Sequence, residues 1–116
     1  MKRYMAVFTG SPASMDAWKS LDAQERQRRE QAGMAAWKQW VERHQAAIAD
    51  DGAPLGKTLR VDKDGIAATR NNLAAYTVVQ AESQEAAAAM FEGHPHFTIF
   101  PGDGVEVMEC LPIPGQ

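Results

Sequence analysis

The sequence predicts one small domain of the α+β class, spanning residues 1–116. Its length suits one domain and not two. Two alanine-rich segments with helical character alternate with several short apolar runs that end at glycine or proline, which is typical of mixed helix and strand. Val, Ile, Leu and Phe account for only 20 residues and alanine for another 20, so one chain can build only a thin core.

The first half begins with a strand and continues with helix. Tyr4 to Thr9 is a β-branched and aromatic run closed by Gly10-Ser11-Pro12, so we expect a strand buried on both faces. Ser11 can cap a helical turn over residues 12–20, with Pro12 at its first position. A long helix is expected from Leu21 to Asp50, with Asp22 as its N-cap.

One face of this long helix carries the strongest periodic signal in the chain. At about 100° per residue its apolar side chains lie within an arc of about 80°, and Trp40 lies just outside that arc. The residues of the arc are Met34, Trp37, Val41, His44 and Ile48. We expect the arc to face the core and Asp50-Asp51-Gly52 to end the helix.

The second half reads as strands around one more helix. We expect a strand over Leu55–Val61, a turn at Asp62–Gly65, a return strand over Ile66–Ala68, a central strand over Leu73–Ala81, a helix from Gln84 to about Glu92 capped by Ser83, and a last strand over Val105–Leu111. This order is that of the ferredoxin-like βαββαβ fold, an antiparallel sheet with both helices on one face.

The other face of such a sheet has no element left to cover it. Because the predicted strands carry apolar residues on both faces, that second face needs a cover. The economical cover is a second copy of the chain, so we expect a homodimer that pairs through its sheet faces. Residues 1–70 hold all 12 Lys and Arg with nine acids, whereas residues 71–116 hold six acids and neither base. This asymmetry indicates association, or it reflects chance and solubility.

Composition excludes several classes of partner. A sequence pI of 5.5 without a basic cluster argues against nucleic acid, and no apolar run reaches the ~20 residues of a membrane span. The N-terminal apolar run is too short for a secretory signal. Cys110 is the one cysteine, so we expect no internal disulfide and a cytoplasmic location.

Two motifs resemble ligand loops without completing them. Gly52 to Thr58 is one residue short of a phosphate loop and precedes a strand instead of a helix. Asp62-Lys63-Asp64-Gly65 has neither the glycine nor the glutamate of a calcium loop at the required later positions. We therefore expect no metal and no cofactor.

The histidines and tryptophans are the candidate site residues. His94 and His96 are candidate acid–base residues, because imidazole titrates near neutral pH. Alternatively, His94 interacts with a helix dipole, or the two bind a metal together with His44. Trp37, Trp40 and His44 share one side of the long helix and are candidate ligand-binding residues. The alternative is that they are core side chains.

Several of these segments together resemble a known family. They are Gly52-x-Pro54-Leu55-Gly56, Ser83-x-Glu85-Ala86-Ala87, His94-Pro95-His96-Phe97 and Val105 to Cys110, besides the tryptophan-bearing helix. The combination resembles the YCII-related (DGPF-like) domain of the dimeric α+β barrel superfamily. The resemblance implies a ferredoxin-like subunit, a dimer with its sheets face to face, and a ligand cleft between helices and sheet.

The resemblance also implies a catalytic pair that this sequence does not keep. Enzyme-like members have a histidine in the first helix and an aspartate before a proline after the second helix. The matching positions here are Trp37, or a residue near it, and His94 before Pro95. We therefore expect a binder of a small organic molecule first. The alternatives are a small isomerase-, hydrolase- or monooxygenase-like enzyme that uses His94 or His96, and a protein-interaction module.

Overall fold

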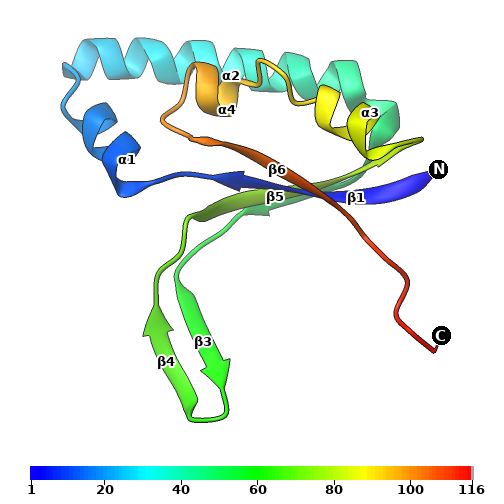
Figure 1. The fold of residues 1–116 in the computed structure, drawn as a ribbon. Coiled ribbons are helices and arrows are strands. Elements are labelled where there is room, and N and C mark those ends of the chain that lie inside the picture. Colours follow the sequence, from blue (N-terminus) through cyan, green and yellow to red (C-terminus); the bar gives the residue numbers. More distant parts are fainter. Residues whose placement is uncertain (116) are drawn as a thin grey trace.

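A computed structural model describes residues 1–115 and confirms the ferredoxin-like α+β fold (Figure 1). The helices are α1 (Pro12–Lys19), α2 (Ala23–His44), α3 (Gln84–Ala89) and α4 (Pro95–Thr98), with a 3-10 turn at Gln45–Ala47. The strands are β1 (Lys2–Thr9), β2 (Ile48–Pro54), β3 (Thr58–Asp62), β4 (Gly65–Thr69), β5 (Leu73–Ala81) and β6 (Gly104–Glu109).

Four strands form one antiparallel sheet in the order β2-β5-β1-β6. The predicted strand over Leu73–Ala81 is interior to that sheet, as expected. Figure 1 shows α2, α3 and α4 together on one side of the sheet, which confirms that the helices share a face. In the described part of the chain, no helix combines the length and the apolar character that crossing a membrane requires.

The core lies between this sheet face and the helices. Alternate residues of β1, namely Tyr4, Ala6 and Phe8, are almost fully buried, which is the period-two pattern of a strand with one face in a core. From the other elements, the core also takes in Trp40, Val79, Ala81, Ala87 and Phe91. Most of these buried side chains come from β1 and β5, whereas the helices contribute Trp40 and Ala87 and the turn after α3 contributes Phe91.

The long helix is shorter than predicted. It ends at His44 and not at Asp50, and Ile48 pairs with Val79 in the sheet instead of extending the helix face. The Asp50–Gly52 segment lies in edge strand β2, where the register shifts on both sides of Asp50. Gly52 has a φ of 71°, and a Cβ there would overlap the backbone carbonyl of Tyr76. Pairing with β5 thus overrides the helical pattern of residues 45–50.

The predicted helix face also needs correction. Met34 lies on the predicted apolar arc but is 66% exposed, whereas Trp40, outside the arc, is 4% exposed. The Trp40 ring packs against Phe91, which follows α3, and against His94, which caps α4, at 5.0 and 4.7 Å between ring centroids. Contacts with those segments, and not only with the sheet, decide which side chains of α2 are buried.

The strand predicted over Leu55–Val61 forms over residues 58–61 as part of β3, but β3 does not belong to the main sheet. The second strand of the sheet is β2, which ends at Pro54, and residues 55–57 belong to no strand. The predicted hairpin does exist, because β3 pairs with β4 across the turn at Asp62–Gly65, but it forms a separate two-stranded sheet. In Figure 1 it stands away from the main sheet, on the side opposite the helices.

The region after β5 is shorter and more broken than predicted. Ser83 caps α3 as expected, with its hydroxyl accepting the Ala86 N–H at 3.1 Å. However, α3 ends at Ala89 and not near Glu92, and the four-residue helix α4 that follows was not predicted. Gly93, with a φ of 66°, reverses the chain between the two.

Candidate functional site

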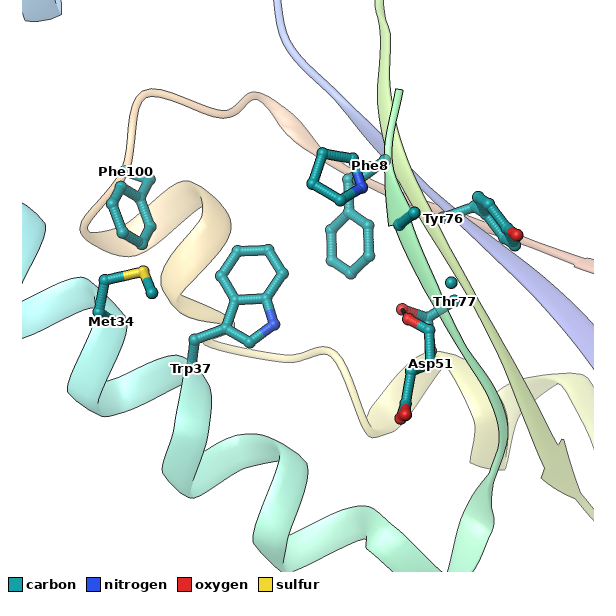
Figure 2. A pocket seen from close by; sticks show the side chains of 11 residues that line it. Phe8, Met34, Trp37, Asp51, Tyr76, Thr77 and Phe100 are labelled. Carbon is teal, nitrogen blue, oxygen red and sulfur yellow. Dashed lines mark hydrogen bonds between the residues drawn. The ribbon is translucent and has the colours of Figure 1, made fainter. Parts of the chain in front are cut away.

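A pocket of about 420 Å³ lies between α2 and the sheet (Figure 2). Its walls come from β1, α2, β2, β5 and the segment after α4, and most of them are apolar. The lining residues are Phe8, Met34, Trp37, Asp51, Gly52, Ala53, Pro54, Ala75, Tyr76, Thr77 and Phe100. This is the place between helix and sheet where the sequence analysis expects a ligand cleft.

Aromatic rings form one wall of the pocket. The Trp37 ring lies 5.3 Å from that of Phe8 and 6.1 Å from that of Phe100, both centroid to centroid. Phe100 approaches α2 closely because residue 33 is glycine: a Cβ there would lie 2.5 Å from the Phe100 ring. Gly33 therefore leaves room for the Phe100 ring at the pocket wall.

Polar groups in the pocket are few. Within residues 1–115 the indole N–H of Trp37 makes no hydrogen bond, and Figure 2 shows its nitrogen on the side of the ring that faces β2 and β5. The Thr77 hydroxyl donates to the backbone carbonyl of Asp51 at 3.2 Å. The Tyr76 ring points away from Trp37, to the other side of the sheet. Trp37 thus offers an unused donor to anything that enters.

His94 lies behind this wall and not in the pocket. It is the N-cap of α4, its Nδ1 accepts the His96 backbone N–H at 3.0 Å, and the residue is fully buried. An accepting Nδ1 places the proton of neutral imidazole on Nε2. In residues 1–115 this Nε2 has no hydrogen-bond partner.

Aromatic rings surround the His94 imidazole. The centroids of Trp37, Trp40 and Phe8 lie 4.5, 4.7 and 5.2 Å from it. Both tryptophans meet it edge to face, a geometry in which an N–H can interact with a ring face. Burial, followed by the nearby His96 and His44, lowers the pKa of His94 from 6.5 to about 4, so the ring is neutral at pH 7.

His96 is held by the backbone of β1. Its Nε2 lies 2.8 Å from the Thr9 carbonyl oxygen, and the residue is 9% exposed. A Cβ at Gly102 would overlap the His96 ring, so the loop after α4 closes directly over it. The ring nitrogen that faces Thr9 is therefore engaged in joining α4 to the sheet.

Trp40 and His44 continue the row of rings along α2. The Trp40 indole N–H donates to the Met90 carbonyl at 2.7 Å, and its ring lies 4.9 Å from that of His44. Burial, followed by the positive charge of Arg43, lowers the pKa of His44. Neither side chain lines the pocket.

The five predicted site residues therefore form one continuous cluster, but only Trp37 lines the pocket. Rings lie in the order Trp37, His94, Trp40, His44, with His96 beside Trp37 at 6.2 Å. The acid–base role of His94 and His96 stays a prediction. Among the described residues, no three His, Cys, Asp or Glu side chains come together as a metal site would require.

Sequence reasoning missed most of the remaining pocket wall. Phe8 carried a usable signal, since alternate residues of its strand share a face with Tyr4 and Ala6. Phe100 and the Gly52–Pro54 segment carried none, because their positions depend on how α4 and β2 dock.

Comparison with known proteins identifies the fold. One solved structure similar to this chain is 5-chloro-2-hydroxyhydroquinone dehydrochlorinase from Burkholderia phenoliruptrix, in complex with 2,5-dihydroxybenzoquinone. The match has a TM-score of 0.56 and 16% sequence identity, and it covers 94% of this chain and 93% of that chain. No protein-family model matches the chain, and no curated protein matches it either. The likeness supports the α+β fold across nearly the whole chain and no more.

Proposed function

We propose that this protein is a YCII-like domain that binds a small planar molecule, an aromatic or quinoid ring with oxygen substituents, in the Trp37 pocket. The observation that carries the proposal is the Trp37 side chain, which offers both a ring face and an unused N–H to the pocket. A volume of about 420 Å³ is within the range of small-molecule sites, which are mainly apolar with a few polar groups.

Ring stacking supplies the affinity in this proposal. Trp37, Phe8 and Phe100 line one wall together, and aromatic pairs contribute about 0.5–1.5 kcal/mol beyond the burial of their area. The Trp37 N–H then selects molecules that carry an acceptor at the ring edge. The similarity in fold to a protein solved with 2,5-dihydroxybenzoquinone makes that compound a suitable first probe.

The absence of histidine from the pocket lining favours binding over acid–base catalysis. The two positions where enzyme-like YCII-related proteins carry the catalytic pair are matched here by Trp37, or a residue near it, and by His94, and these two rings contact each other edge to face. In the proposed binder, His94 supports the Trp37 ring. Acid–base catalysis would require His94 or His96 to leave its present contacts and reach the pocket.

The proposed binder is a homodimer that pairs through the sheet face opposite the helices. Alternate residues place Met5, Val7, Tyr76 and Met108 on that face, where Met5 is paired with Met108 and with Val78, which is already only 6% exposed. Figure 1 shows no helix over it. A second copy would remove this apolar surface from water, and we place the dimer in the cytoplasm.

Calorimetric titration with two matched probes tests the binding proposal. Hydroquinone and cyclohexane-1,4-diol carry the same oxygens, but only hydroquinone is planar, so only hydroquinone is expected to bind. 2,5-Dihydroxybenzoquinone is titrated into Cys110→Ser, because the exposed Cys110 thiol could otherwise add to the quinone.

Three tryptophan variants locate the site. Trp37→Ala is expected to weaken binding at least tenfold, and Trp37→Phe about threefold because it keeps the ring and loses the N–H. Trp18→Phe changes a tryptophan outside the pocket lining and should leave the dissociation constant unchanged. Equal affinity in the parent and Trp37→Ala would refute the proposal. If the parent converts the probe to a product, whereas His94→Asn binds the probe without converting it, the result would support an enzyme instead.

A further inference from the structure

The β3–β4 hairpin has one apolar face and one polar face. Because Leu59 is paired with Ala68 and Val61 with Ile66, these four side chains share a face. Arg60, Thr58 and their partners lie on the other. Leu59, Val61 and Ile66 are 68%, 73% and 71% exposed. The apolar face of the hairpin is therefore open to water along its whole length.

The hairpin extends from the body of the subunit. The radius of gyration is 16.2 Å, against about 13 Å for a compact chain of this length. Figure 1 shows two parts of the chain that extend from the body, the hairpin and the C-terminal segment after β6. An isolated two-stranded hairpin is marginally stable in water at best, so this one needs a surface to cover its apolar face.

The hairpin and the uncovered sheet face lie on the same side of the subunit. Figure 1 shows the hairpin projecting from the sheet in the direction away from α2. A second copy seated on the sheet face would therefore stand beside the hairpin. One occupant can cover both apolar surfaces.

Charge favours a second copy of this chain as that occupant. Residues 57–70 carry four cations, Lys57, Arg60, Lys63 and Arg70, against two acids. Residues 71–116 carry six acids and no Lys or Arg. Arg60 pairs with Asp62 and Glu109 pairs with Lys2, but no salt bridge among residues 1–115 joins the two regions. Their net charges of opposite sign can therefore steer association between chains.

We propose that the β3–β4 hairpin is a dimerisation arm whose apolar face, Leu59, Val61, Ile66 and Ala68, packs on the sheet side of a second copy. The polar face with Arg60 then faces outward. The exchange is reciprocal in a two-fold dimer, so each interface contains two arms. The inference rests on the sheet-face dimer of the proposed function and adds an element to it.

Matched glutamate variants separate the arm from the sheet face. Val61→Glu puts a charge on the apolar face of the arm, and Ala67→Glu puts the same charge on its polar face, opposite Arg60. Met108→Glu puts it on the outer sheet face. Losing the burial of one Val61 side chain raises the dimer dissociation constant about tenfold. Because each dimer contains two arms, Val61→Glu should raise it about a hundredfold.

Sedimentation analysis across a concentration series measures the dimer dissociation constant of each variant, and circular dichroism checks folding. We expect Val61→Glu and Met108→Glu to dissociate and Ala67→Glu to stay dimeric. If Val61→Glu matches Ala67→Glu while Met108→Glu dissociates, the arm is refuted and the sheet-face dimer stands. A monomeric parent refutes both.

Hydrogen exchange of the unmodified protein tests the arm without any substitution. Amides of residues 59–68 should be protected at concentrations where the dimer forms and should exchange quickly when dilution separates it. Protection in the arm that does not change with concentration would overturn the proposal, even if Val61→Glu failed to fold.

Discussion

Burial of His94 makes the stability of this protein depend on pH in a specific window. The pKa of His94 is lowered from 6.5 to about 4 by burial and the neighbouring histidines. Above pH 6.5 the ring is neutral in both the folded and the unfolded chain. Between pH 6.5 and 4 the unfolded chain binds a proton that the folded protein does not, so stability falls as the pH falls.

The magnitude follows from the size of the shift. Each pKa unit corresponds to 1.36 kcal/mol, so the lost stability amounts to about 2 kcal/mol at pH 5 and about 3 kcal/mol once the pH is below 4. His94→Asn removes the titrating group and keeps an oxygen that can cap α4. Between pH 7 and pH 5, the free energy of unfolding of His94→Asn should therefore fall by about 2 kcal/mol less than that of the parent.

Urea unfolding at both pH values measures this difference, and the carboxylates that titrate in both proteins cancel in the comparison. His44→Asn is the matched control, because its histidine is only partly buried and its removal should change the pH dependence less. Equal loss of stability in the parent and His94→Asn would refute the reasoning that the buried ring is held neutral.

Three substitutions test other parts of the structure. Trp40→Phe should lower the free energy of unfolding by about 1–2 kcal/mol, because the Met90 carbonyl loses the indole N–H that donates to it. Urea unfolding measures this change, and an unchanged stability would contradict a stabilising Trp40–Met90 hydrogen bond. Gly52→Ala should destabilise by more than about 2 kcal/mol, since its positive φ and the β5 backbone leave no room, whereas Gly56→Ala should have little effect on the melting temperature. Ser83→Ala should lower the free energy of unfolding by about 1 kcal/mol, whereas Ser83→Asp should leave it unchanged because aspartate can also cap α3. Equal stability of the two variants would show that the α3 cap contributes nothing.

Local sequence signals predict the elements whose pattern and environment agree. The strand over Tyr4–Thr9 and the strand over Leu73–Ala81 are apolar and β-branched, and both lie inside the sheet. The caps at Ser11 and Ser83 are short-range hydrogen bonds, and both form, whereas Asp22 precedes α2 without a side-chain cap hydrogen bond. The fold class follows from this order of elements, because few topologies accommodate it.

Elements that depend on docking were not predictable in the same way. Residues 45–50 are compatible with helix, and only pairing with β5 makes Ile48 the start of a strand. Likewise, the sequence places His94 near the end of a helix. Its full burial depends on the rings of Phe8, Trp37 and Trp40, which come from two separate elements. The five candidate residues do lie in one cluster, but that Trp37 alone among them lines the pocket could be learned only from the structure.

The indole N–H signals of the three tryptophans test the central claim most directly. Trp37 lines the pocket, Trp40 donates to Met90, and Trp18 lies elsewhere, near Phe100. A nitrogen–proton correlation spectrum of the Cys110→Ser protein, recorded during titration with 2,5-dihydroxybenzoquinone, follows each signal separately. We predict a saturable shift of the Trp37 signal that is much larger than those of Trp18 and Trp40. A Trp37 signal that stays in place at millimolar probe, or a shift centred on Trp18, would contradict the assignment of the pocket as the binding site.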